Sequence, residues 1–261
     1  MLKSIILRKK RGLNSEDARR VRQQGHDDAL EFALAIGLSK DYQNDAKAKK
    51  DVIDPSGDAH SVKSGQKKWQ IFLYGLGRFE SDEAFAVMNG MGALLINCIK
   101  AFPESFDEYQ KNKQRAKEKL RIPMREMAEK LRLPIRLKAF MNKSMFNGGE
   151  VDYLTVKHDG KFHVFYYKDV IEKMSEKLEV LNSSARSEGQ TPEQKVIFRY
   201  KGNNLGELEM RNDSPVHYRE IRFNMVKPKV MEFLFKEIPF SKNFNDKVLM
   251  YGITEKKFGR W

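Results

Sequence analysis

The segment 51–65, DVIDPSGDAHSVKSG, concentrates residues that could do chemistry on a phosphate group. It contains three aspartates, Asp51, Asp54 and Asp58, and a lysine near its end, Lys63. Carboxylate oxygens hold Mg²⁺, and a bound cation can make a water nucleophilic and offset the charge that builds up on a reacting phosphoryl group. The residue types in this segment are therefore suited to hydrolysis of a phosphodiester bond.

A β-hairpin would bring these side chains together. Residues 55–58, PSGD, are typical turn residues between two short runs, which predicts that a strand at 51–53 pairs with a strand at 59–64. Side chains alternate along a strand, so Ser61 and Lys63 share one face and Asp51 can face Lys63 across the ladder. The hairpin is the simplest way to position Asp51 and Lys63 for common chemistry.

The pattern Asp51-x(9)-Ser61-x-Lys63 resembles the PD-(D/E)xK nuclease superfamily, best known from type II restriction endonucleases, and the resemblance covers about residues 25–80. The resemblance implies an α/β fold, with a mixed-sheet restriction-endonuclease-like core flanked by helices. It also implies that Asp51 binds Mg²⁺ and that Lys63 orients or activates the attacking water.

Ser61 stands where the family has its second carboxylate. Serine is a poorer magnesium ligand than a charged oxygen, so another acidic residue has to complete the site. Glu31, in the preceding helix, is the preferred replacement, since some relatives place a carboxylate there. Asp58 in the turn and Asp54 are the alternatives. The candidate catalytic residues are thus Asp51, Ser61, Lys63 and Glu31, and the candidate metal ligands are Asp51, Glu31 and Asp58.

The composition of the chain points to a polyanionic partner. Its 261 residues include 49 Lys plus Arg against 36 Asp plus Glu, a difference of 49 − 36 = +13, and such a charge attracts nucleic acid. Aromatic residues make up 11% of the chain, which is typical of a folded protein with a core. The lone Cys98 excludes an internal disulfide and a cysteine-based zinc cluster.

Several other classes of protein are excluded by missing patterns. No apolar run approaches the ~18–20 residues of a membrane helix, and the amino-terminal apolar stretch is too short for a secretory signal, so we expect a cytoplasmic protein without a membrane partner. No GxxxxGK[ST] or GxGxxG motif occurs, so no nucleotide cofactor is expected. The five histidines lack metal-ligand spacing, and His60 is expected to be an ordinary exposed residue.

Basic and amide side chains outside the hairpin are candidates for DNA contact. Between Lys111 and Lys138 the chain has eleven Lys or Arg against three Glu, 11 − 3 = +8, and such cations can lie along phosphates or form a solvated helix face. The run Arg8 to Arg11 has the same two interpretations. Glu207 and Glu209 form either a second metal-binding candidate or an exposed strand face. The candidate DNA-binding residues are Lys67, Lys68, Gln70, Arg115, Lys117, Arg121, Arg211, Asn212 and Arg219.

The chain divides by pattern into a helix-rich and a strand-rich portion. Residues 1–145 are expected to form the nuclease core, with a buried helix after Asp27, a helix favoured over a strand at 67–76, and helices from 82 to 142 that break at Pro103, Pro123 and Pro134. Residues 146–261 are expected to grip or read DNA, with strands at 151–156, 162–166, 196–200, 205–211 and 220–225 and a helix near 167–181.

Together these patterns predict a Mg²⁺-dependent, sequence-specific endonuclease that cuts double-stranded DNA to leave 5′-phosphate ends, as a type II restriction enzyme does. Cutting both strands of a palindromic site usually requires two active sites, so a homodimer is expected. The alternatives are a DNA- or RNA-binding protein without catalysis and an RNA-directed enzyme.

Overall fold

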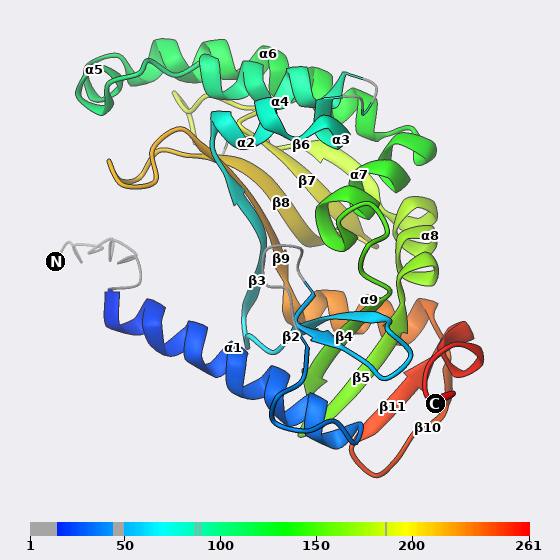
Figure 1. Cartoon of the computed structure of the whole chain (residues 1–261). Helices are drawn as coiled ribbons and strands as arrows, with labels where there is room; N and C mark the ends of the chain where they lie inside the picture. Colours follow the sequence, from blue (N-terminus) through cyan, green and yellow to red (C-terminus); the bar gives the residue numbers. More distant parts are fainter. Residues whose placement is uncertain (1–14, 44–49, 87, 89, 186) are drawn as a thin grey trace, which may run out of the picture.

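Two β-sheets form the frame of the molecule (Figure 1). The computed structural model describes residues 15–43, 50–86, 88, 90–185 and 187–261; the basic run Arg8 to Arg11 lies outside the described residues. The expectation of an α/β fold with a mixed sheet and flanking helices is confirmed at this coarse level. No helix within the described ranges is long and apolar enough to span a bilayer.

The first sheet is mixed and six-stranded, in the order β1-β2-β4-β5-β11-β10. Strands β2 and β4 run parallel, as do β5 and β11, and the other neighbours are antiparallel. Its strands are β1 (Val52–Ile53), β2 (Ala59–Lys63), β4 (Tyr153–His158), β5 (Lys161–Tyr166), β10 (Phe240–Asn243) and β11 (Val248–Tyr251).

The predicted hairpin at 51–64 is confirmed, because β1 pairs with β2 in antiparallel register. Its turn forms from local chemistry: Asp54 Oδ1 accepts the backbone N–H groups of Ser56 at 2.9 Å and Asp58 at 3.0 Å, and Gly57 takes a φ of 87°, which glycine adopts without steric cost. The turn fixes the register of the strand that carries Ser61 and Lys63.

The second sheet is five-stranded and antiparallel, in the order β3-β9-β8-β7-β6. Its strands are β3 (Lys68–Tyr74), β6 (Glu179–Asn182), β7 (Lys195–Tyr200), β8 (Asn203–Arg211) and β9 (Glu220–Val226). The helix favoured at 67–76 is wrong, because β3 occupies those residues. Along β3 the exposed Lys68 and Gln70 alternate with the buried Trp69 and Ile71. The apolar spacing of this segment also fits a helix, and pairing with β9, about 150 residues away in the chain, makes it a strand.

Helices gather along one face of the five-stranded sheet (Figure 1). Pro103 lies between helices and Pro134 begins one, as expected, but the break expected at Pro123 is wrong, since this proline is buried inside α6 and the helix continues despite the lost backbone donor. These helices are α2 (Leu76–Ser81), α3 (Glu83–Ala86), α4 (Met91–Lys100), α5 (Phe106–Lys111), α6 (Lys113–Leu131) and α7 (Pro134–Phe146). Helix α8 (Tyr167–Lys177) packs on α7 and on β4 and β5 of the six-stranded sheet.

Helix α1 (Ser15–Ala35) packs on the six-stranded sheet. Ala29, Phe32, Ala33 and Ile36 form a stripe at helical spacing that is buried against residues including Val52, Tyr153 and Phe162. A larger core fills the space between the five-stranded sheet and its helices and includes the buried Cys98. Two further helices complete the chain, α9 (Lys227–Glu237) and the 3-10 helix η2 (Gly252–Lys256).

Both sheets combine strands from the two portions expected from the sequence. Strands β1 and β2 come from residues 1–145, yet their sheet is completed by β4, β5, β10 and β11. Likewise β3 is the edge of a sheet whose other strands follow residue 146. The helix-rich and strand-rich portions are therefore interleaved in the fold.

Candidate active site

Asp51, Ser61 and Lys63 lie together at one end of the hairpin. The register Val52 with His60 places Asp51 opposite Ser61, and Lys63 lies two residues further on the same face. Lys63 Nζ donates to Ser61 Oγ at 2.6 Å, Ser61 Oγ donates to Asp51 Oδ2 at 3.4 Å, and Lys63 Nζ lies 3.8 Å from Asp51 Oδ2. The structure brings these three predicted residues into one hydrogen-bonded cluster.

The cluster is anchored on one side and open on the other. Asp51 Oδ2 also accepts the backbone N–H of Val62 at 2.8 Å, which fixes the carboxylate against the strand. The side chains of Lys63 and Asp51 are 25% and 32% exposed, so a substrate can reach both. Ser61, by contrast, is buried and holds the other two in place.

The donor set of this cluster fits a magnesium ion shared with a substrate phosphate. Among the described residues nothing hydrogen-bonds to Asp51 Oδ1, so a hard, charged oxygen remains available for a cation. Mg²⁺ is commonly held by one or two carboxylates together with substrate phosphates and waters. Within the described ranges there is no group of three acidic, histidine or cysteine side chains that could hold a metal ion, so this fit depends on the phosphate as a partner ligand.

Glu31 lies in a different ion cluster. Lys157 Nζ lies 2.6 Å from Glu31 Oε2 and 2.7 Å from Asp28 Oδ1, so the lysine is paired with two carboxylates of α1. Lys63 is paired with Val156 across β2 and β4, so the next residue, Lys157, points to the opposite face of the sheet. The structure therefore does not bring Glu31 to Asp51.

Asp28 shows how firmly this second cluster is held. Burial acts to raise the pKa of Asp28, but its hydrogen bond to Lys157 and the charge of that lysine outweigh burial and lower the pKa. The Asp28 side chain is 4% exposed. A carboxylate this well paired serves the attachment of α1 to β4.

Asp54 and Asp58 lie at the far end of β2 from Lys63. Tyr153 Oη donates to Asp58 Oδ2 at 3.0 Å, and burial, the largest cause, raises the pKa of Asp58. Asp54 Oδ1 caps the turn while its Oδ2 lies 3.3 Å from His60 Nε2. Both aspartates have structural partners and neither joins Asp51.

His60 is fully buried, so the expectation of an exposed histidine is wrong. Its ring packs between Phe32 and Tyr153, and its Nδ1 lies 2.9 Å from Thr155 Oγ1. Burial, the largest cause, lowers the pKa of His60, although Asp54 acts in the opposite direction. With Nε2 donating to Asp54, the neutral ring accepts from the threonine hydroxyl.

Three of the predicted DNA-binding residues lie on the face of the five-stranded sheet that points away from α4, α6 and α7. They are Lys68, Gln70 and Arg211. The register Gln70–Asn224–Glu207 runs across three strands, and Lys68 and Arg211 share that face. The opposite face carries buried residues such as Phe223 and Leu208. Polar side chains on this outer face are thus presented as a set.

Glu207 and Glu209 on this outer face are already paired with cations. Glu207 Oε1 lies 3.0 Å from Lys68 Nζ and its Oε2 lies 3.0 Å from Lys195 Nζ. Glu209 pairs with Lys195 and Arg222. The two glutamates therefore form a ladder of alternating charge along the strand, but the expectation of an exposed strand face is wrong for Glu209, which is buried, while Glu207 is half-buried.

The cations of α6 differ in their partners. Arg121 lies 3.0 Å from Glu118 and 3.3 Å from Glu193, and Arg125 lies 2.6 Å from Glu193. Arg115, Lys117 and Lys119 have no ion pair with any carboxylate in the described part of the chain. These cations belong to a helix on the inner side of the five-stranded sheet, and the structure does not bring them to the outer face.

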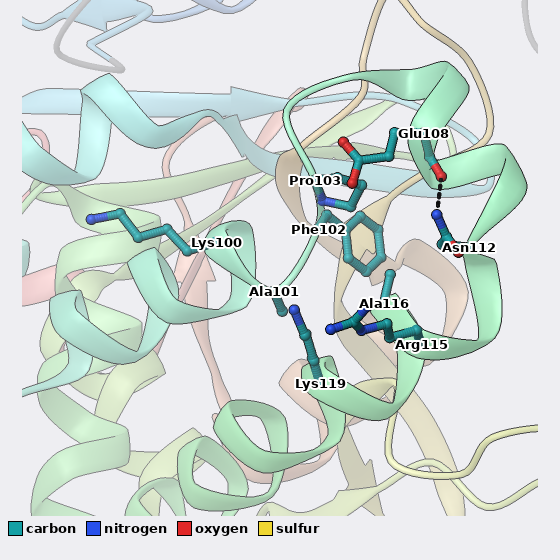
Figure 2. A pocket seen from close by; sticks show the side chains of 9 residues that line it. All are labelled: Lys100, Ala101, Phe102, Pro103, Glu108, Asn112, Arg115, Ala116 and Lys119. Carbon is teal, nitrogen blue, oxygen red and sulfur yellow. Dashed lines mark hydrogen bonds between the residues drawn. The ribbon is translucent and has the colours of Figure 1, made fainter.

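A hollow of about 280 Å³ lies between the end of α4 and the beginning of α6. Figure 2 shows Arg115 and Lys119 reaching from α6 toward Ala101, while the Phe102 ring and the Glu108 carboxylate form another side. Arg115 and Lys119 have no ion pair with a described carboxylate, so this hollow is a candidate binding site for an anionic group.

The remaining candidates lie at loops and strand ends. Lys67 is exposed in the connection between β2 and β3, and Asn212 is half-buried after β8. Arg211 Nε pairs with Asp213 at 2.7 Å. Arg219 adopts a φ of 60°, its Nη1 lies 3.8 Å from Glu104, and its buried Nε has no hydrogen-bond partner in the structure.

Comparison with known proteins identifies no relative. No protein-family model matches the chain, and neither a curated protein nor a solved structure matches it. The function of the chain is therefore inferred from its own geometry.

Sequence reasoning missed two lysines beside the site, Lys157 and Lys227. Lys157 follows four buried residues on β4, and this pattern alone gives no sign of its partners on α1. Lys227 opens a helix with a lysine and a proline, which predicts a helix start and nothing about burial. Their roles follow from contacts between segments far apart in the chain.

Proposed function

We propose that this protein is a magnesium-dependent endonuclease that hydrolyses phosphodiester bonds in double-stranded DNA, with a restriction-endonuclease-like core. The observation that carries the proposal is the cluster of Asp51, Ser61 and Lys63, in which a lysine amine lies 2.6 Å from a hydroxyl and 3.8 Å from a partly exposed carboxylate. A mixed sheet with α1 packed on it supports the same reading.

Each residue of the cluster has a distinct task in this reaction. Asp51 would hold Mg²⁺ jointly with a DNA phosphate, and the cation, when bound, supplies activation of water and stabilisation of the charge on the phosphoryl group. The Lys63 ammonium would orient the attacking water by hydrogen bonding and offset negative charge on the phosphate. Ser61 holds the lysine amine next to the carboxylate.

Double-stranded DNA is the substrate that fits the charge of the chain. The net charge of +13 draws a polyanion, and the outer face of the five-stranded sheet carries the exposed Gln70 and the half-buried Arg211, whose side chains can bond to base edges. The products would be a 5′ phosphate and a 3′ hydroxyl. Cleavage of both strands at a palindrome would use a homodimer on DNA.

A non-catalytic DNA-binding protein is the second candidate, and one observation favours it. The described residues place a single carboxylate beside Lys63, and Glu31, which could have supplied a second, is neutralised by Lys157. If Asp51 and a phosphate do not suffice to hold Mg²⁺, the chain would bind DNA without cutting it.

The two candidates are separated by incubating the protein with unmethylated phage DNA in Mg²⁺, in Ca²⁺ and in EDTA. We expect discrete fragments with 5′-phosphate ends in Mg²⁺ alone, and no fragments from Asp51→Asn, with Asp41→Asn, an exposed aspartate in the loop before the hairpin, as the control. DNA that stays intact in Mg²⁺ but is retarded on a gel would favour the binding protein.

A further inference from the structure

Lys227, the first residue of α9, is buried with 3% of its surface exposed. Burying an ammonium group is costly unless it is well paired, so buried lysines normally face a carboxylate. Among the described residues no carboxylate lies within ion-pair distance of Lys227. Its Nζ donates instead to two backbone carbonyl oxygens, that of Lys157 at 2.7 Å and that of Ser64 at 3.3 Å.

These two carbonyls lie where the pairing between the parallel strands β2 and β4 ends. The last registered pair between the strands is Lys63 with Val156, so Ser64 and Lys157 are the next residues along each strand. At this point the ladder stops and both carbonyl groups need another donor. One lysine amine supplies it to both.

The backbone of Lys227 holds the same connection from its other end. Its N–H donates to the carbonyl of Lys67 at 3.0 Å, and the preceding residue, Val226, is registered with Lys68 at the start of β3. Lys227 thus contacts both ends of the short segment 64–67, where the chain passes from the six-stranded to the five-stranded sheet. That segment begins one residue after Lys63.

We propose that Lys227 is a positioning residue for Lys63: by bonding to Ser64, Lys157 and Lys67 it sets where the end of β2 lies relative to the five-stranded sheet. The inference rests on the proposed nuclease function for its catalytic consequence. The outer face of the five-stranded sheet carries the candidate DNA contacts, so Lys227 also determines where DNA held on that face lies relative to Lys63.

The charge of Lys227 is not needed for packing. A methionine has nearly the same length and volume and avoids the cost of burying an ammonium group, which offsets part of the cost of leaving two buried carbonyls without a donor. Lys227→Met would leave the carbonyls of Ser64 and Lys157 without their donor. The variant therefore separates the fold, which should survive, from the fixed position of the strand end, which should not.

The experiment compares Lys227→Met with Lys143→Met. Lys143 is another largely buried lysine, 11% exposed, whose Nζ lies 3.1 Å from Asp82, and it belongs to α7, away from the hairpin. Each variant is measured for Tm, hydrogen exchange in peptides covering 61–68, DNA affinity in EDTA and single-turnover cleavage in Mg²⁺.

For Lys227→Met we expect a Tm no lower than that of Lys143→Met, faster exchange at 61–68, unchanged DNA affinity and a cleavage rate about 10- to 100-fold lower, since a misplacement on the order of 1 Å has effects of this size. Lys143→Met removes one of the two cations paired with Asp82, the other being Arg78, and is expected to lower Tm while it preserves the rate. Loss of rate in Lys227→Met without a greater loss of Tm than in Lys143→Met is the signature of positioning.

Wild-type cleavage and wild-type exchange in Lys227→Met would overturn the inference, as would a rate that falls only in step with Tm. If the wild-type chain does not cut DNA, the proposed function fails, and exchange still decides the positioning role: unaltered exchange at 61–68 refutes it and faster exchange supports it. Should Lys227→Met not fold, Lys227→Gln keeps a neutral donor on a shorter side chain; faster exchange in this variant supports the inference and wild-type exchange refutes it.

Discussion

At the scale of single residues, the hairpin contains two clusters with opposite characters. Asp51 and Lys63 are held together by the buried Ser61 but are themselves partly open to solvent, as a site for a large anionic substrate requires. Asp54 and His60, at the other end of β2, have no exposed side-chain surface and hold the turn in place. The candidate catalytic cluster and the residues that stabilise the turn thus lie at opposite ends of β2.

The buried His60 predicts a pH dependence of stability. Burial lowers its pKa in the folded protein below the unfolded value of 6.5, so above this pH both states are neutral and the contribution of the site is complete. As pH falls below about 6.5, the unfolded chain takes up a proton that the folded chain resists, and stability is lost. Urea unfolding midpoints between pH 7.5 and 5.5 should fall less steeply for His60→Gln than for wild type.

The control for this prediction is His26→Gln, since His26 is exposed on α1 and should leave the slope unchanged. Equal slopes in wild type and His60→Gln would contradict the role assigned to burial.

The buried Ser61 predicts a specific loss in Ser61→Ala. Without the hydroxyl, Lys63 loses its 2.6 Å hydrogen bond and Asp51 loses one contact. A hydrogen bond to a charged group contributes about 1.5–3 kcal/mol, so we expect at least about a tenfold lower cleavage rate. DNA affinity in EDTA should not change. A wild-type rate would show that Lys63 is oriented without the serine.

At the scale of elements, α6 separates two kinds of cation on one helix. Its first turn contains no acidic residue, so Arg115 and its neighbours add positive charge at the positive end of the helix dipole, which is unfavourable unless an anion binds there. Further along, Arg121 and Arg125 are neutralised by Glu193. Only the first group is available for phosphate.

This difference predicts the salt dependence of DNA binding. Arg115→Ala with Lys119→Ala should weaken binding and lower the slope of log K against log salt concentration by about 2, since each lost phosphate contact lowers it by about 0.9. Arg121→Ala with Arg125→Ala is the matched control on the same helix and should change the slope little. Equal effects of the two pairs, measured by fluorescence anisotropy, would exclude the hollow at Arg115 as a phosphate contact.

The elements also show which features could be predicted from the sequence. The hairpin was predictable because its turn is built by Asp54 and Gly57 within the segment itself. Strand β3 was not, because its apolar spacing also fits a helix and only pairing with β9 decides. The partner of Glu31 was equally hidden, since Lys157 lies 126 residues away along the chain.

At the scale of the whole molecule, the interleaved sheets predict a single cooperative unit. Each sheet takes strands from both sides of residue 145, so neither portion contains a complete sheet. Calorimetry should give one unfolding transition with matching calorimetric and van't Hoff enthalpies, and a fragment of residues 1–145 should remain unfolded. Two transitions, or a folded fragment, would contradict the interleaving.

The whole molecule also explains how a site with few acidic residues could work on DNA. The positive charge of the chain would attract the phosphate backbone, and a phosphate can supply the metal with oxygen ligands that the described residues do not. The strand end that carries Lys63 is tied to the second sheet by Lys227. The substrate phosphate would complete the set of metal ligands, and Lys227 would hold Lys63 in position.

The most direct test of the central claim is the single-turnover cleavage of a DNA duplex in Mg²⁺ by Lys63→Ala, compared with Lys67→Ala. Lys67 is an exposed lysine four residues further along the same connection, so it controls for the loss of a positive charge near the site. At saturating protein concentration we expect cleavage by the wild type and Lys67→Ala but none by Lys63→Ala. Lys67→Ala should lower DNA affinity at most, because Lys67 is a candidate DNA contact that lies outside the cluster, and Lys63→Ala should still bind DNA. Metal-dependent cleavage by Lys63→Ala at the wild-type rate would contradict the assignment of the active site to Asp51, Ser61 and Lys63.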